Sequence, residues 1–582
     1  MSLPHRPRMD VLVVLIAAVA GVGVAAQGPS RKWEPITEER LAKPRPGDWL
    51  NYRRTFDAFG FSPLDAINRT NVRNLRPVWT YPSMEGGRWA LTPVVANGIL
   101  YFSEGGGRVV AIDVVTGEMV WTHERRMPED IGKSQAFHRS RGVAVFEDKV
   151  YWGTPDCYLV TLDARTGKMV WEVKTGDYRT GEGHIHPPLI TQGKVFFGYS
   201  GGDSNSRGKV AAFDAHTGKN IWTTYTTPAK GEPAYDTWNA EKTGVPPLGA
   251  ATWHTPTFDA ELGLVYFATG QPTPRSAALR GSGDALYSNS ILALELDTGK
   301  IRWHYQILPG ESWDLDSPYE SMLLDMAIDG QKRKALIHTS KIGWGVILDR
   351  TTGKFLKSFK TGYDNVVTGW TQAGRPIYNE DLIPKPEDQD SGKSFFVCPH
   401  LHGTRNLQSP SYSPLTGLYY VGINNACMTV SFFTAKFGPN ARYQGMTNGV
   451  AKMAPGYDYV GEFVAFDPLT GKRAWQFRPK SGSPMAASAL ATAGGIVFGG
   501  TSDRQFFALD DQSGKLLWQM RLNGDISGAP VTFEVDGRQY VAVGAGGRIA
   551  QTTTLGPLTN VDVPPGNGVI WVFALPDVGG QQ

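Results

Sequence analysis

The stretch Ala111-Ile-Asp-Val-Val-Thr-Gly-Glu-Met-Val-Trp121 recurs along the chain and decides the fold. With small changes it returns at 161–171, 212–222, 293–303, 347–357, 465–475 and 508–518. Each copy reads as an apolar strand, an Asp-x-x-Thr-Gly turn and a second strand that usually closes on Trp. Asp and Thr side chains can hydrogen-bond the turn backbone, and Gly accepts the positive φ that the turn needs. The chain is therefore expected to be a series of β-hairpins, with Trp filling the space between neighbouring sheets.

The spacing of the copies predicts how the hairpins are arranged. Successive turn glycines are 43 to 54 residues apart, except for two longer intervals of 81 and 118 residues that hold insertions. A unit of this size is typical of a four-stranded propeller blade, whereas the units of a β-solenoid are shorter. Seven turns give seven blades. An eighth can be assembled from 529–535, 539–544 and 569–575, with an outer strand from 77–81. We therefore predict an all-β fold, an eight-bladed β-propeller of four-stranded blades with tryptophan-docking repeats, closed by joining the two chain ends.

The composition excludes some classes of function. The 582 residues include Lys+Arg 58 and Asp+Glu 55, so the formal net charge is only +3. That balance gives no support for an electrostatic grip on nucleic acid or on an anionic membrane surface. Hydrophobic residues at 41% are enough for a large core, which excludes disorder for most of the chain.

The first residues are typical of an export signal. His5, Arg6 and Arg8 precede an apolar run from Val11 to Ala20, and small residues follow up to Ala26. A membrane anchor is the alternative, but the apolar run is short for a bilayer span and the small residues suit a peptidase. We predict a cleaved signal peptide at 1–26 and one propeller domain at 27–582. The mature chain would then be periplasmic, without a membrane span.

The three cysteines exclude one cofactor arrangement. No Cys-x-x-Cys-His string occurs, so no c-type haem is attached to this sequence. Cys398 and Cys427 could pair in an oxidising compartment, which would leave Cys157 free. Cys157 itself is expected to be a small buried hydrophobic residue.

The insertions hold the candidate chemistry, because unusual long loops at one end of a propeller channel mark a site. The 218–299 interval contains Trp253 and Gln271, and the loop after Trp303 contains Asp314 and Asp316. Two acids this close repel each other unless a cation or a shared proton offsets the repulsion. Oxygen-rich groups suit a hard metal such as calcium, although a Trp-Asp-x-Asp string by itself is most often a turn and cap pattern.

Two neighbouring features have ordinary interpretations. His184 and His186 share a strand face and could form a metal pair, but two histidines alone usually serve packing. Glu311, beside the paired acids, is expected to be a solvated loop residue.

The loop strings together resemble a known family. They are Asn71 to Trp79, Ser200 to Gly208, Leu264 to Pro272, Trp313-Asp-Leu-Asp316, Gly422 to Met428 and Leu490 to Thr501. With them the chain resembles the periplasmic quinoprotein alcohol dehydrogenases of the methanol and ethanol dehydrogenase type, which bind pyrroloquinoline quinone (PQQ). The resemblance runs from about Gly47 to Trp571, nearly the whole predicted mature chain.

The resemblance implies a role for twelve positions. Trp253 matches the tryptophan that stacks on the quinone, and Asp314 matches the general base toward the substrate hydroxyl. Arg141 matches the arginine that meets a cofactor carboxylate, and Lys341 the cation at the quinone oxygens. Ser200, Gly201 and Asn406 match further cofactor contacts. Asp203, Gln271, Asp314 and Asp316 match metal ligands for Ca²⁺ or a lanthanide ion. Cys398 and Cys427 match a family disulfide.

The sequence also departs from the family pattern. Asp203 stands where the family has Glu, and Gln271 where it has Asn, so one ligand is a methylene shorter and the other a methylene longer. Gln135-Ala136 replaces two adjacent cysteines, Ala486 replaces a tryptophan, and Ile185 replaces a cofactor-binding threonine. These changes keep oxygen ligands but alter the geometry and the pocket.

The resemblance implies oxidation of a small-molecule alcohol to an aldehyde or ketone. Electrons would then pass to a separate acceptor such as a periplasmic cytochrome c. A sugar, polyol or polymeric alcohol dehydrogenase is an alternative that uses the same chemistry. A periplasmic scaffold propeller without enzymatic activity is the alternative from another class.

Overall fold

A computed structural model describes residues 33–86, 89–134, 139–435, 444–564 and 566–576. The predicted signal peptide and the Gln135-Ala136 position lie outside the described residues. Among the helices within these ranges, none is both long and apolar enough to cross a membrane.

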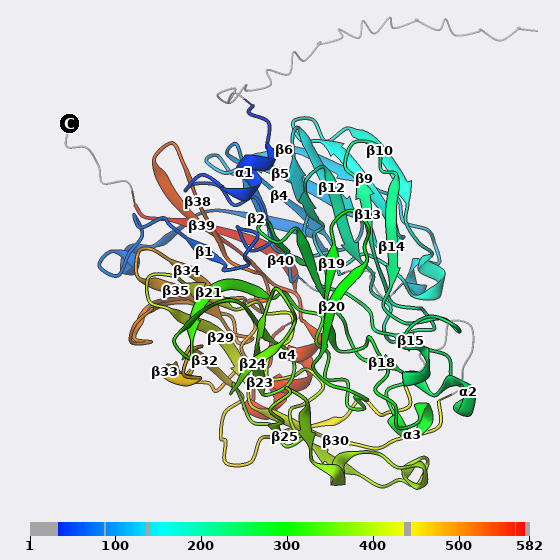
Figure 1. The fold of residues 1–582 in the computed structure, drawn as a ribbon. Coiled ribbons are helices and arrows are strands. Elements are labelled where there is room, and N and C mark those ends of the chain that lie inside the picture. Colours follow the sequence, from blue (N-terminus) through cyan, green and yellow to red (C-terminus); the bar gives the residue numbers. More distant parts are fainter. Residues whose placement is uncertain (1–32, 87–88, 135–138, 436–443, 565, 577–582) are drawn as a thin grey trace, which may run out of the picture.

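Antiparallel sheets of four strands make up most of the described chain. Figure 1 shows them following one another around the molecule in chain order, from blue to red. The first four consist of β3–β6 (Val94–Ala96, Ile99–Glu104, Arg108–Asp113, Met119–Glu124), β7–β10 (Ala144–Phe146, Lys149–Gly153, Tyr158–Asp163, Met169–Lys174), β11–β14 (Leu189–Thr191, Lys194–Gly198, Lys209–Asp214, Asn220–Tyr225) and β16, β17, β19 and β20 (Thr257–Asp259, Leu264–Ala268, Ser290–Glu295, Ile301–Gln306).

Three further sheets continue this order. They consist of β21–β24 (Met322–Ile328, Gln331–Thr339, Trp344–Asp349, Phe355–Lys360), β28, β29, β32 and β33 (Ser411–Ser413, Leu418–Asn424, Gly461–Asp467, Lys472–Phe477) and β34–β37 (Leu490–Thr492, Ile496–Gly500, Gln505–Asp510, Leu516–Arg521). The last of these gains a fifth, parallel strand, β1 (Phe61–Ser62).

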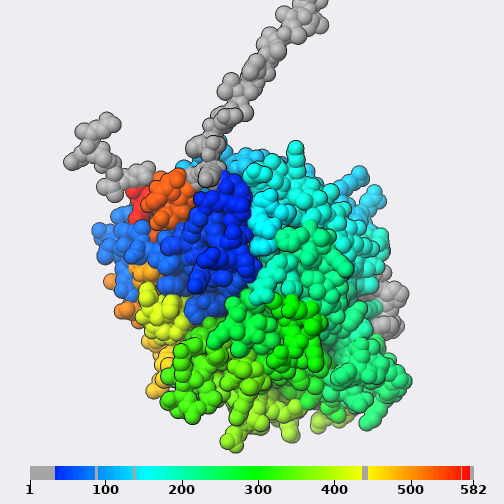
Figure 2. Space-filling model, turned by 45° about the horizontal axis from the view of Figure 1, so that its top comes forward, coloured from blue at the N-terminus to red at the C-terminus, as the bar shows by residue number. Residues whose placement is uncertain are grey.

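One more sheet joins the two ends of the chain. It contains β38 (Val531–Val535), β39 (Arg538–Ala545), β40 (Asn567–Ala574) and β2 (Arg76–Gly86), and β2 pairs antiparallel with β40. Figure 2 shows the N-terminal segment in blue beside the C-terminal residues in orange and red. The predicted outer strand at 77–81 therefore lies where the sequence pattern placed it, and the prediction of an all-β propeller is confirmed.

The two insertions carry the small elements. The 218–299 interval contains the pair β15 (Leu248–Gly249) and β18 (Pro272–Thr273), with helices α2 (Ala240–Thr243) and α3 (Ala277–Arg280). The 353–471 interval contains the pair β25 and β26 (Val367–Trp370, Pro376–Tyr378) and the sheet of β27, β30 and β31 (Phe395–Val397, Ala426–Val430, Val450–Met453). Helices α1 (Glu38–Ala42) and α4 (Ala550–Leu555) lie near the chain ends.

The repeated turns have the predicted geometry. At the first copy, the Asp113 carboxylate accepts the N–H groups of Val115 and Thr116 at 2.9 and 3.1 Å, and Gly117 has φ +74°. The same pattern recurs at Asp163 and its turn glycine.

The repeat tryptophans contact the turn of the following sheet. Trp121 Nε1 donates to the carbonyl of Ala164 at 2.9 Å, and a Cβ on Gly167 would lie only 2.5 Å from the Trp121 ring. The same N–H···O contact to the next sheet is made by Trp79, Trp222, Trp303 and Trp475. The copy that lacks this Trp uses Phe359, which lies against Gly471. The indole rings therefore join neighbouring sheets through both packing and a hydrogen bond.

Candidate functional site

Loops from several successive sheets converge on one cavity of about 430 Å³. Its lining includes every residue that the sequence singled out for cofactor, metal or catalysis: Arg141, Ser200, Gly201, Asp203, Trp253, Gln271, Asp314, Asp316, Lys341 and Asn406. These side chains come from the segments before β7 and after β12, β15, β17, β20, β22 and β27. The fold thus brings together residues spread over 266 positions of the sequence.

One wall of the cavity is formed by Trp253 and Arg141. The Arg141 guanidinium carbon lies 5.3 Å from the centroid of the Trp253 ring, and its Nη1 donates to the Trp253 carbonyl at 3.3 Å. Tyr319 packs edge-on against the same indole, with ring centroids 5.2 Å apart. The indole is half-buried, so part of its surface stays available to a flat ligand, with a cation beside it for an anionic substituent.

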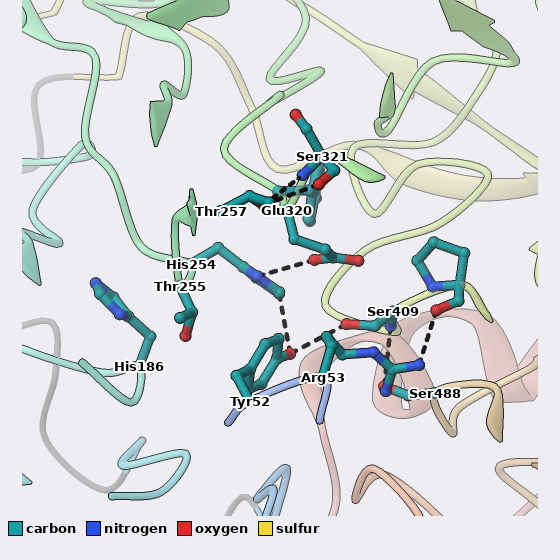
Figure 3. Close-up of polar contacts among 12 residues, drawn as sticks. Tyr52, Arg53, His186, His254, Thr255, Thr257, Glu320, Ser321, Ser409 and Ser488 are labelled. Atoms are coloured by element: carbon teal, nitrogen blue, oxygen red, sulfur yellow. Dashed lines mark hydrogen bonds and ion pairs between the residues drawn. The ribbon is translucent and has the colours of Figure 1, made fainter. Parts of the chain in front are cut away.

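The backbone around Trp253 is fixed by a buried polar network that the sequence analysis missed (Figure 3). His254 Nδ1 lies 3.0 Å from Glu320 Oε2, and the Tyr52 hydroxyl lies 3.4 Å from His254 Nε2. Arg405 donates to Glu320 at 3.2 Å. Burial alone would raise the pKa of Glu320, but Arg405 and His254 outweigh it and hold that pKa well below its ordinary value. Glu320 therefore stays ionised in the interior, paired with Arg405 and next to His254, the residue that follows Trp253.

The polar residues predicted to contact the cofactor are held by their neighbours. Ser200 Oγ donates to the carbonyl of Gly183 at 2.9 Å. Gly201 has φ +115°, and a Cβ there would lie 2.6 Å from Ser206 Oγ, so a larger residue would not fit without movement. Asn406 Oδ1 accepts from the Tyr319 hydroxyl at 3.3 Å.

The opposite part of the lining is a charged cluster around Asp314 and Asp316. Lys341 Nζ lies 3.2 Å from Asp314 Oδ1 and 2.8 Å from Asp316 Oδ2, and it donates to the Asp314 carbonyl at 2.8 Å. Asp316 Oδ1 accepts the Gln271 backbone N–H at 2.8 Å. Burial raises the pKa of the Asp314 carboxyl to about 8, although Arg275 and Lys341 oppose that shift. Burial lowers the pKa of Lys341, but Asp314 and Asp316 outweigh it, so the ammonium stays charged.

Arg275 is a member of this cluster that sequence reasoning did not find. Its Nη2 lies 2.8 Å from Asp203 Oδ1 and 3.1 Å from Asp314 Oδ2. Gln271 Nε2 also donates to Asp203 Oδ1, at 2.9 Å. The only signal in the sequence is the short spacing between Gln271 and Arg275 in Gln-Pro-Thr-Pro-Arg, which no general pattern singles out.

Several sequence predictions are decided by this geometry. Glu311 was expected to be solvated, and that prediction is wrong: its side chain is fully buried and accepts the Leu315 N–H at 2.8 Å, so it shapes the loop that carries Asp314. Cys398 and Cys427 form a disulfide, and Cys157 is free and buried, as predicted. His184 and His186 are buried and contact backbone carbonyls, as packing residues do.

The residues present fit a bound quinone. The cavity holds buried donors that have no partner among the described residues, namely Nε and Nη1 of Arg275 and Nε2 of His400. His400 Nδ1 accepts the His402 N–H at 3.1 Å, so its Nε2 carries the proton and can donate. For a metal, the donor set has the right chemistry because it consists of oxygens. However, no three His, Cys, Asp or Glu side chains in the described ranges converge as a metal cluster.

Comparison with known proteins identifies the family. The model of the glucose/ethanol/alcohol dehydrogenase β-propeller domain with PQQ matches residues 49–361 and 479–541. The quinoprotein alcohol dehydrogenase PedH of Pseudomonas putida is 33% identical over 607 residues, which cover 98% of each chain. The lanthanide-dependent methanol dehydrogenase of Methylacidiphilum fumariolicum strain SolV is 33% identical and covers 86% of this chain and 85% of its own.

A solved structure agrees with the sequence matches. A europium-containing methanol dehydrogenase superposes with a TM-score of 0.84 at 31% identity, over 92% of this chain and 99% of the other. The prediction of an oxidoreductase is confirmed, and the scaffold alternative is set aside. The chain belongs to the family of PQQ-dependent alcohol dehydrogenases.

Proposed function

We propose that this chain oxidises an alcohol to an aldehyde or ketone in the periplasm and passes the electrons to a separate acceptor such as a cytochrome c. The observation that carries the proposal is the position of Asp314. Its carboxylate lines the same cavity as Trp253 and is held between two cations, Arg275 and Lys341. A carboxylate fixed in the cavity that would hold the cofactor can remove the proton of a bound alcohol.

The cofactor would lie against Trp253. Arg141 would meet one of its carboxylates, and Ser200, Gly201 and Asn406 would supply polar contacts around it. PQQ, when bound, supplies the two-electron acceptor chemistry of the reaction. The protein contributes orientation, charge and exclusion of water.

Asp314 would act as the general base and take the proton of the substrate hydroxyl. Burial raises the pKa of this carboxyl to about 8, and the two neighbouring cations oppose that shift, so they favour the ionised form that can accept the proton. Lys341 is held by Asp314 and Asp316, and its charge would stabilise negative charge on the cofactor during the reaction.

A hard cation would be held by Asp203, Gln271, Asp314 and Asp316. All four line the cavity, and their carboxylate and amide groups carry the oxygen atoms that suit Ca²⁺ or a lanthanide ion. Two of the acids already contact Arg275 in the structure, and two contact Lys341.

The scaffold of the site is proposed to be one domain of eight blades at 27–582, preceded by a signal peptide at 1–26. Within the described residues, eight sheets of four or five strands and the contacts of the Trp121 and Trp222 indoles with the following sheet support this count. The sequence contains no Cys-x-x-Cys-His motif, so the electrons are proposed to leave through another protein.

The test is reconstitution of purified protein with PQQ and either Ca²⁺ or La³⁺. Quinone absorbance should remain with the protein after gel filtration, and it should be lost in Trp253→Ala and Arg141→Ala. Turnover of a panel of small alcohols, sugars and polyols, followed with an artificial acceptor, then selects the substrate class. Absence of quinone retention with every metal would overturn the proposed function.

A further inference from the structure

Arg275 lies where two of the proposed metal ligands face each other. One nitrogen, Nη2, is within ion-pair distance of both Asp203 and Asp314, at 2.8 and 3.1 Å. A single positively charged group thus joins the two carboxylates, as a bound cation would. Gln271 donates to the same oxygen of Asp203 through its Nε2. The amide therefore turns its nitrogen, not its oxygen, toward this acid.

The Arg275 side chain is held in this position. Its side chain is only 4% exposed, and its backbone N–H donates to the carbonyl of Gln444 at 2.7 Å. Its carbonyl accepts from Arg280 Nη2 at 2.9 Å. Burial lowers the pKa of Arg275, but Asp314 and Asp203 outweigh it, so the guanidinium stays charged.

The charges of the cluster show how the position of Arg275 affects the binding of a metal ion. Asp203, Asp314 and Asp316 carry three negative charges when ionised. Arg275 and Lys341 carry two positive charges, which offset two of them. A cation that enters must either displace the guanidinium or bind beside it. Both alternatives weaken metal binding, and the repulsion grows with the charge of the metal ion.

We infer that Arg275 is a built-in cation that competes with the metal for Asp203 and Asp314, lowers the metal affinity of the site and disfavours trivalent ions most. The inference rests on the proposed function, because it concerns the proposed metal ligands. It assigns to this chain a residue that sets the strength and the selectivity of metal binding.

The experiment compares the wild type with Arg275→Met and Arg275→Lys, all without quinone. Met keeps most of the length and removes the charge, whereas Lys keeps the charge. Calorimetric titration with Ca²⁺ and with La³⁺ gives the affinities. We expect Arg275→Met to bind both ions at least about tenfold more tightly than the wild type, with the larger gain for La³⁺. Arg275→Lys should stay within about threefold of the wild type.

A second measurement, the melting temperature with and without metal, tests whether Arg275→Met is less stable than the wild type. Arg275→Met removes the guanidinium from Asp203 and Asp314, so its melting temperature without metal should fall. Added metal should then raise it more than it raises that of the wild type. Folding of Arg275→Met only in the presence of metal would also support the inference, and failure to fold even with metal would overturn it.

The remaining outcomes are decisive. The inference is overturned if Arg275→Met binds the metal ions no more tightly than the wild type does, or if neither protein binds them. It is also overturned if the metal affinity of Arg275→Lys rises as much as that of Arg275→Met. The proposed function is judged separately, by quinone absorbance of the wild-type protein. A wild type that binds no quinone would therefore remove the function without deciding the titration.

Discussion

At the scale of single residues, substitutions of Asp314 and Asp316 should have different effects. Asp314→Asn keeps the size and most hydrogen bonds of the side chain but removes its ability to accept a proton. We expect turnover to fall on the order of a hundredfold or more while quinone absorbance remains with the protein. Steady-state rates and gel-filtered spectra of the same sample check both parts. Full activity in Asp314→Asn would contradict the assignment of the base.

Asp316→Ala should change metal binding more than chemistry. It removes a carboxylate that contacts Lys341 at 2.8 Å and accepts the Gln271 N–H. Because a trivalent ion gains most from each carboxylate, La³⁺ affinity should fall further than Ca²⁺ affinity. Titration with both ions measures the ratio. Unchanged affinity for both ions would show that Asp316 does not serve as a metal ligand, and an equal loss would show that it does not favour the trivalent ion.

The sequence could predict the site only where its residues sit in extended motifs. Asp314, Trp253 and Lys341 were found because the strings around them resemble a family. Arg275 and the His254–Glu320 pair were not found, because their roles depend on contacts that only the fold creates. Glu311 was predicted wrongly for the same reason, since loop position alone does not reveal that a carboxylate binds its own backbone.

At the scale of elements, the indole contacts between sheets can be tested at two glycines of one sheet. Gly353 has φ +73°, and a Cβ there would lie 2.5 Å from the Trp303 ring of the preceding sheet. Gly330 has φ +76°, but a Cβ there meets nothing within 4 Å. Both alanine variants bear the cost of a left-handed residue, roughly 1–2 kcal/mol. Only Gly353→Ala also pushes against an indole.

We therefore expect the free energy of unfolding to fall by about 1–3 kcal/mol more in Gly353→Ala than in Gly330→Ala. Urea denaturation of the two variants and the wild type, with the slope held to a common value, measures the difference. Equal losses in the two variants would mean that the Trp303 contact contributes little to the joint between sheets.

At the scale of the whole molecule, the repeat predicted the fold well because every level of the sequence agrees with it. The Asp-x-x-Thr-Gly turns, the strand lengths and the closing Trp all specify the same hairpin, and their spacing specifies the sheet. The sheet that joins the chain ends was predicted from three apolar strands without a turn motif, and β2 pairs with β40 as expected. The small sheets in the insertions were not predicted, because their strands lack a repeated signal.

The distribution of histidines over the molecule predicts how stability changes with pH. His184, His186, His338 and His400 are buried, and burial lowers their pKa values to about 3, 4, 3 and 3. In the unfolded chain a histidine takes up a proton near pH 6.5. Between pH 6.5 and about 4, the unfolded state therefore binds more protons than the folded state. The stability that neutral burial contributes is present above pH 6.5 and is lost as the pH falls.

The test is the slope of the free energy of unfolding against pH. For each buried histidine, the loss between pH 6.5 and pH 5 should be about 2 kcal/mol. His338→Asn should reduce the slope of the wild type by about 1 kcal/mol per pH unit, whatever its effect on stability at pH 7.5. His216→Asn, at a side chain that is 53% exposed, is the matched control for the substitution itself. A slope in His338→Asn equal to that of the wild type would show that the folded state accepts the proton at this site as readily as the unfolded chain does.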